Sequence, residues 1–194
     1  MTDFATRHPR VLSVLTTVRD RSEFSHRSAI RSIALLNVIQ DREEGARFAL
    51  HHHAFDRATP RAAILEGLAE RVPRDATLIA RSPQIIEHAL RHIKATGQPL
   101  PPADLQLLQK LRGDLEILPL KCRQAALDEI GAAFALRRAG PGSSLLARCR
   151  RAPEEVQCLW LSFLWTLCRR TDRTALTSAW QAWSALQRAR PILF

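Results

Sequence analysis

The chain has 194 residues, of which 46% are hydrophobic and 25% charged, a balance typical of a globular protein with one hydrophobic core. The most apolar run, residues 156–168, is too short to cross a membrane, so the sequence excludes a membrane-spanning helix there. The net charge of +10 favours a polyanionic partner, either nucleic acid or an acidic protein surface. Only Lys94, Lys110 and Lys121 are lysines, and an arginine-rich surface in contact with water alone would also explain the charge.

The four cysteines predict a reducing compartment. Cys122, Cys149, Cys158 and Cys168 have no CxxC spacing, and the last two lie within apolar sequence. Buried thiols of this kind favour a cytoplasmic location. The first ten residues lack the apolar core of a signal peptide, which agrees with that prediction.

The apolar pattern predicts three strands followed mostly by helices. The expected strands lie at residues 10–17, 29–39, 47–55 and 75–81, with 115–120 as a fifth strand or the start of a helix. Thr59-Pro60 and Ser82-Pro83 have the sequence of helix starts. The expected helices cover residues 61–71, 82–95, 104–112, 123–136, 153–170 and 174–188.

This order predicts an α/β fold. Three consecutive strands predict an antiparallel meander, and a further strand after a helix makes the sheet mixed, with helices on its faces. We expect one domain over residues 1–194. Residues 153–194 form its helical C-terminal part, which packs on the sheet or forms an interface.

Several segments resemble one known family in order and apolar pattern. They are "VLSVLTTV", "AIRSIALLNVI", "DATLIARSPQIIEHALRHIKATG", and "LEILPL" followed by "ALDEIGAAFAL". Over about residues 9–170 the chain resembles the DEDD superfamily of 3′–5′ exonucleases, the proofreading-exonuclease type with an RNase H-like fold. The resemblance implies an RNase H-like sheet and a site at which four carboxylates hold two divalent ions.

The resemblance also places the family's catalytic positions on this chain. The first two acids correspond to Ser13 and Leu15, and the third to Ile86. The last motif, a histidine followed by an aspartate, corresponds to Cys149 and Glu154. Only Glu154 is a carboxylate, and neutral side chains do not replace the anionic oxygens that hard divalent ions need. We therefore expect a pseudoenzyme with no catalytic residue, no bound metal and no cofactor.

The first functional hypothesis is an inactive exonuclease-like protein that binds nucleic acid in a regulatory or scaffolding role. Arg81, which corresponds to the family's His-Asn pair, would line the groove together with Arg148, Arg150 and Arg151. An unrelated α/β domain in which Ser13, Leu15 and Ile86 are ordinary core positions stays open as an alternative.

Two other functions also remain open. One is a protein-interaction or inhibitory module, with a homodimer as one form, that uses the tryptophans of the last two helices as anchors. These tryptophans are Trp160, Trp165, Trp180 and Trp183. The other is an active, metal-dependent 3′–5′ exonuclease whose carboxylates come from elsewhere in the chain. The candidates are Asp20, Glu23 and Asp128.

Histidine pairs and one cysteine complete the candidate sites. On a strand, His51 and His53 share one side, and His88 and His92 share one face of a helix. Neither pair has a third ligand at a suitable spacing, so we expect no metal at either. Cys149 lies between two arginines, which predicts a lowered thiol pKa.

Overall fold

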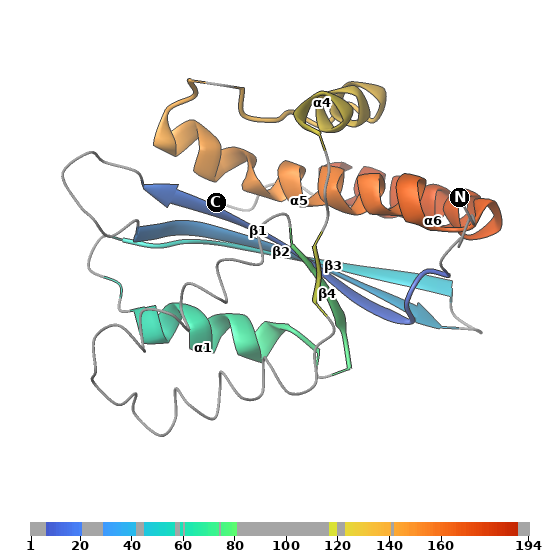
Figure 1. Cartoon of the computed structure of the whole chain (residues 1–194), viewed down its shortest axis with the longest axis horizontal. Helices are drawn as coiled ribbons and strands as arrows, with labels where there is room; N and C mark the ends of the chain where they lie inside the picture. Colours follow the sequence, from blue (N-terminus) through green and yellow to red (C-terminus); the bar gives the residue numbers. More distant parts are fainter. Residues whose placement is uncertain are drawn as a thin grey trace.

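The structure is a mixed β-sheet with helices on both faces (Figure 1). It is a computed structural model, and it describes residues 7–20, 29–41, 45–56, 59, 61–73, 75–80, 117–119, 123–140 and 142–189. Helix α1 lies on one side of the sheet, and α4, α5 and α6 lie on the other. The predicted α/β class is confirmed.

Within the described residues, five strands form the sheet in the order β3-β2-β1-β4-β5. The strands β1 (Val11–Asp20), β2 (Ala29–Asp41) and β3 (Gly45–Ala54) pair antiparallel, which confirms the predicted meander. The short strands β4 (Thr77–Ala80) and β5 (Ile117–Pro119) run parallel to β1. The segment at 115–120 therefore contributes a strand, so the predicted fifth strand is the correct alternative.

Alternation along the strands divides the core into two clusters. Leu12 and Val14 of β1 face α5, whereas Leu15 belongs to the cluster that packs against α1. β2 follows the same rule, with Leu36 on the α5 side and Leu35 on the α1 side. A strand buried on both faces has a nearly continuous apolar sequence, which is why β1 and β2 were predictable.

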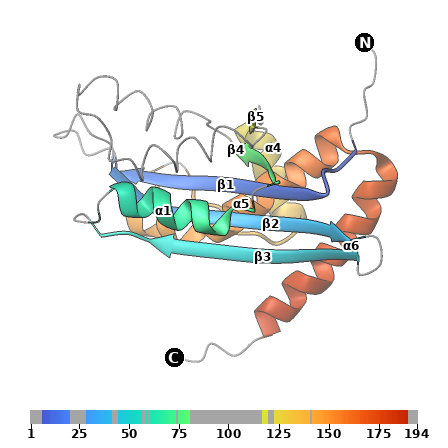
Figure 2. The ribbon, with the colours of Figure 1, turned by 90° about the horizontal axis from the view of Figure 1, so that it is seen from below.

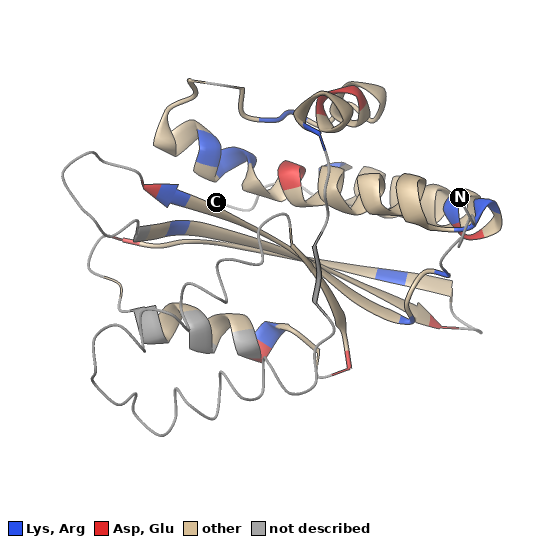
Figure 3. Ribbon diagram, viewed as in Figure 1, with Lys and Arg blue, Asp and Glu red and all other residues tan. Residues whose placement is uncertain are grey.

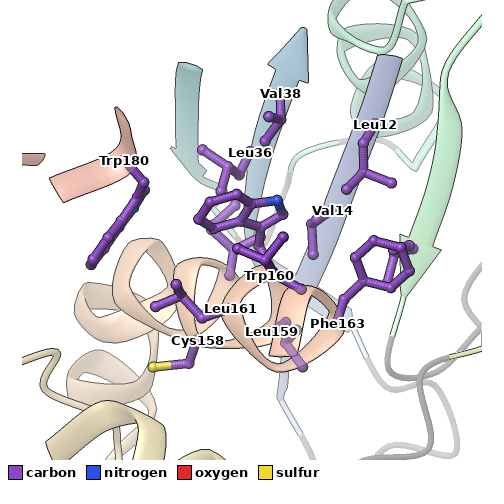
Figure 4. Packing of buried hydrophobic residues seen from close by; sticks show 14 of the residues in the cluster. Leu12, Val14, Leu36, Val38, Cys158, Leu159, Trp160, Leu161, Phe163 and Trp180 are labelled. Carbon is purple, nitrogen blue, oxygen red and sulfur yellow. The ribbon is translucent and has the colours of Figure 1, made fainter. Parts of the chain in front are cut away.

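The cluster on the α5 side is built around Trp160, which lies between α5 and the strands β1 and β2 (Figure 4). Its ring is fully buried and contacts Phe48 of β3 and Trp180 of α6, at centroid distances of 5.3 and 6.3 Å. Its indole Nε1 donates a hydrogen bond to Nε2 of His8 at 3.2 Å. One tryptophan therefore links α5, α6, the sheet and the segment that precedes β1.

Helix α1 (Arg61–Arg71) has the bounds that the sequence predicts. Seen from below, it lies along the face formed by β1, β2 and β3 (Figure 2). Ile64 and Leu68 are buried one turn apart, and they pack against Leu35 of β2.

The C-terminal helices are α4 (Gln124–Ala133), α5 (Leu145–Leu167) and α6 (Arg170–Ala189). The prediction that a helix begins at Pro153 is wrong, because α5 begins two turns earlier. The side chain of Ser144 caps it by accepting a hydrogen bond from the Ala147 amide at 3.2 Å. Pro153 lies inside α5.

A histidine of the sheet approaches α5 near this proline. A proline has no amide hydrogen, so the carbonyl four residues earlier, that of Cys149, loses its helical partner. His52 of β3 forms a hydrogen bond with the Cys149 backbone, and its Nε2 lies 2.9 Å from Oγ of Ser32. The His52 ring therefore lies beside the carbonyl that lacks its helical partner.

Some predicted elements lie outside the described residues, namely the helices at 82–95 and 104–112. Within the described residues, no helix combines the length and the apolar composition that a membrane span requires.

Candidate functional site

Ser13 and Leu15, which correspond to the first two acids, lie on the side of β1 that faces α1. Ser13 is completely buried and Leu15 is 2% exposed. The Ser13 hydroxyl donates a hydrogen bond to Oδ1 of Asn37 at 2.7 Å, and Nδ2 of Asn37 donates to the Arg71 carbonyl at 2.8 Å. The position of the first acid is therefore occupied by a buried hydroxyl whose hydrogen bond is satisfied within the core.

Ile86 and Arg81 lie outside the described residues, as do His88 and His92. Whether Ile86 lies beside Ser13 and Leu15 stays a prediction, and so does the role of Arg81 in a groove.

The retained carboxylate, Glu154, lies on α5, and α5 packs on the opposite face of the sheet from Ser13 and Leu15. Its Oε1 accepts a hydrogen bond from Arg151 at 2.9 Å, and its Oε2 accepts one from the Arg137 amide. Glu154 thus joins α5 to the segment that follows α4. The structure does not bring it together with the first two motif positions.

The other candidate carboxylates also form ion pairs. Asp20 pairs with Arg31 at 3.2 Å, and Asp128 pairs with Arg138, whose side chain is 5% exposed. Glu23 lies outside the described residues. Within the part of the chain that the structure describes, no group of three histidine, cysteine or acidic side chains is arranged to hold a metal ion.

Cys149, at the other position of the last motif, has a raised thiol pKa. Burial is the main cause and raises the pKa, while Arg148 and Arg31 oppose it. The expectation of a lowered pKa is wrong because desolvation of the thiolate outweighs the neighbouring positive charges. The thiol is free, like those of Cys158 and Cys168.

Arginines dominate the N-terminal half of α5. Figure 3 shows this basic region of the helix above the ends of β1 and β2. Arg150 is exposed, Arg148 is half-buried, and neither has a carboxylate partner among the described residues. Arg151 differs because it is paired with Glu154. Of the predicted phosphate-binding residues, Arg148 and Arg150 therefore present their charge without competition from a described carboxylate.

The four tryptophans have different environments. Trp160 and Trp180 are buried in the core, and Trp183 packs against Phe48 at 5.5 Å. Trp165 is 50% exposed, with the guanidinium of Arg173 5.8 Å from its ring centre. A homodimer built on these residues has only Trp165 as a well-exposed anchor.

The three histidines of β3 follow the predicted alternation. His51 is paired with Leu35 and His53 with Ile33, both on the α1 side of the sheet, whereas His52 contacts α5. Sequence reasoning missed what lies between these histidines and α1, which is a cavity of about 590 Å³. Two sequence features lie at this cavity: the alternation of histidines on β3 and Gly67 at the centre of α1.

Comparisons with known proteins do not show which family the chain belongs to. No family model matches the chain, and no curated protein matches it. One solved structure that resembles it is the crystal structure of Prototype Foamy Virus Protease-Reverse Transcriptase in its native form. The identity is 13% and the TM-score 0.37, over 82% of this chain and 22% of that chain. A likeness at this level assigns neither family nor function.

Proposed function

We propose that the chain is an RNase H-like, exonuclease-like domain that does not hydrolyse phosphodiesters and acts by binding nucleic acid. The strand order β3-β2-β1-β4-β5, with β2 antiparallel to its neighbours and β4 and β5 parallel to β1, supports the RNase H-like arrangement. Its role is regulatory or scaffolding, and we place it in the cytoplasm, where thiols stay reduced.

One observation supports the absence of hydrolysis: the described positions that correspond to metal ligands do not lie together. Ser13 and Leu15 are sealed beneath α1, and Glu154 is engaged on the other side of the sheet. Two-metal hydrolysis needs several carboxylates around one solvent-accessible point, where they hold both ions and the attacking water. The described residues offer no such point.

The binding surface that we propose is the N-terminal half of α5. Arg148 and Arg150 are two positions apart on a helix that is anchored to the sheet by Val156 and Trp160, so their side chains leave it about 200° apart around its axis. Each guanidinium, without a described carboxylate partner, is suited to phosphate oxygens, which Arg binds with two parallel hydrogen bonds. Binding of this kind positions the backbone of a nucleic acid and carries little base specificity.

Fluorescence anisotropy with labelled single-stranded DNA, double-stranded DNA and RNA tests the proposal. We expect binding whose affinity falls linearly in a plot of log K against log salt. The double variant Arg148→Ala, Arg150→Ala should weaken binding about tenfold and reduce the salt slope by about 2. A matched control is Arg170→Ala at the start of α6, about 25 Å away along α5.

Two results would contradict the proposal. Digestion of a 3′-labelled oligonucleotide that depends on Mg²⁺ or Mn²⁺ would favour the active-nuclease alternative, and survival of that activity in Glu154→Ala would point to relocated carboxylates. Equal affinities of the wild type, the double variant and Arg170→Ala would remove α5 from the binding surface.

One observation favours the second candidate, a protein-interaction module. Trp165 and Leu167 are exposed at the C-terminal end of α5, by 50% and 40%. Absence of nucleic-acid binding, together with a homodimer in light scattering that Trp165→Ala dissociates, would favour this function over the first.

A further inference from the structure

A cavity of about 590 Å³ lies between α1 and the β2–β3 part of the sheet, within the size range of small-molecule sites. It is on the opposite face of the sheet from α5 and its arginines. Neither the exonuclease resemblance nor the proposed binding of nucleic acid uses it.

The lining of the cavity is mixed, with more polar than apolar accessible surface, and a few side chains supply the apolar part. Ile33 and Leu35 of β2 supply the part that belongs to the sheet, and Leu68 supplies part of the helical wall. Phe55, just beyond β3, stands beside His53 with ring centres 4.7 Å apart. The two ring planes are inclined at 52° to each other, so a planar ligand can stack on one of the two rings.

Polar groups lie beside this apolar part of the lining. The His51 imidazole faces the same space as Arg71 at the end of α1, and the two interact electrostatically. Burial, helped by the positive charge of Arg71, lowers the pKa of His51, which keeps the imidazole neutral near pH 7. A neutral imidazole has one N–H group that can donate a hydrogen bond to an anion held by the neighbouring guanidinium.

Arg71 has donors to spare among its described contacts. Its Nη1 donates to the Gly67 carbonyl at 2.6 Å and lies 4.0 Å from Glu70, a carboxylate whose side chain is 71% exposed. An exposed pair at that distance is weak, so an entering anion competes with Glu70 at little cost. The bond to Gly67 fixes the guanidinium at the mouth of the cavity.

Gly67 gives the guanidinium this place. A Cβ atom at position 67 would lie 3.2 Å from Nη1 of Arg71, closer than nearly all such contacts. Because that atom is the far end of a flexible side chain, an added Cβ would displace it by a few tenths of an ångström. Gly67 thus leaves room for the Arg71 side chain to fold back over α1 beside the cavity.

We infer that this cavity binds a small aromatic carboxylate, with the ring against Phe55 and the apolar residues and the carboxylate on Arg71. An aromatic body matches the apolar part of the lining and the ring of Phe55, and a planar carboxylate matches the two-donor geometry of a guanidinium. A metal ion does not fit, because the described residues provide no three-ligand group there. The inference stands independently of the proposed nucleic-acid function.

Isothermal titration with naphthalene-2-carboxylate tests the inference on the full chain. We expect saturable binding with one site by the wild type. Naphthalene-2-carboxamide has the same shape without the charge and should bind about tenfold more weakly, because it loses a charge-assisted hydrogen bond. This comparison uses one unaltered protein, so it holds even if a variant fails to fold.

Three variants assign the binding to this cavity. Arg71→Met removes the guanidinium and should weaken binding of the carboxylate at least about tenfold, while it leaves binding of the carboxamide unchanged. Glu70→Gln removes the competing carboxylate and should strengthen binding about twofold. Ala63→Phe fills the cavity from an exposed position on α1 and should abolish binding of both compounds.

Arg150→Met is the matched control. It removes an exposed arginine on the other side of the sheet, and it should leave binding of the carboxylate unchanged while it weakens nucleic-acid binding. The two proposals can therefore fail separately. Absence of saturable binding, equal affinity for the carboxamide, or an unchanged affinity in Arg71→Met would each overturn the inference.

Discussion

The two faces of the sheet differ in how completely they are closed. On the α5 side, large side chains from three helices fill the space, and Trp160, Trp180, Leu159 and Leu161 are at most 1% exposed. On the α1 side, among the described residues, α1 covers a smaller cluster beside a cavity of about 590 Å³ next to β3. Of the two described clusters, the one on the α5 side has more buried residues, and the α1 side has room for a ligand. The closely packed core and the cavity thus lie on opposite faces of the same sheet.

Leucine truncations on the two faces should have the largest effect and test this contrast directly. Leu159→Ala on α5 should lower the free energy of unfolding by about 4 kcal/mol, and Leu68→Ala on α1 by about 2 kcal/mol. Leu159 loses contacts on every side, whereas Leu68 already borders the cavity. Urea denaturation of both variants measures the difference. Equal losses would mean that the two faces contribute alike.

Restoring an acid at the first motif position comes next. Ser13→Asp should cost about 3 kcal/mol, because it buries a carboxylate beside Oδ1 of Asn37. Asn37 cannot turn its amide toward the new acid without losing its bond to the Arg71 carbonyl. Ser13→Ala, the control, should cost only about 1 kcal/mol. A stable Ser13→Asp, Leu15→Glu variant that gains Mg²⁺-dependent nuclease activity would refute the view that this position is sealed core.

Protonation of His8 should have a smaller effect on stability. This residue connects the segment before β1 to α5. Its Nε2 accepts a hydrogen bond from Trp160, so a second proton on the ring breaks that bond. Burial lowers the pKa of His8, although a backbone bond to Pro9 and the charge of Asp172 oppose it.

The sign of the pH dependence follows from that shift. Because the folded chain binds this proton less readily than the unfolded chain, stability is complete above the ordinary pKa of 6.5 and falls as the pH drops through the folded value. His51 and His52 also have lowered pKa values, so three of the described histidines contribute in the same direction. His8→Gln keeps an acceptor for Trp160 and should show a shallower loss of the urea midpoint between pH 7.5 and 5.5. An unchanged slope would exclude His8 as a contributor.

Local sequence patterns predicted the strands and the helix that are determined by residues close together in the sequence. The apolar runs of β1 and β2 and the Thr59-Pro60 start of α1 gave a mixed sheet and a helix with correct bounds. The alternation of the β3 histidines also placed His51 and His53 on one side. Each of these features depends on residues within a few positions of one another.

Features that depend on distant partners were not predictable. Pro153 has the sequence of a helix start, yet it lies inside α5, where the distant His52 of β3 approaches the Cys149 backbone. Charge neighbours of Cys149 in sequence suggested a lowered pKa, but burial by the fold decides the direction. The same holds for Glu154, whose separation from Ser13 depends on which face of the sheet α5 covers.

The pairing of His52 with the proline gives the smallest and most specific prediction. His52→Ala should lower the free energy of unfolding by about 1 kcal/mol, because it leaves the Cys149 carbonyl without a donor. In a Pro153→Ala background the helix supplies its own amide to that carbonyl, so the same truncation should cost less than half as much. A double-mutant cycle in urea measures this coupling. Additive effects would show that His52 does not compensate for the proline. Apolar packing alone would then hold α5 on this face of the sheet.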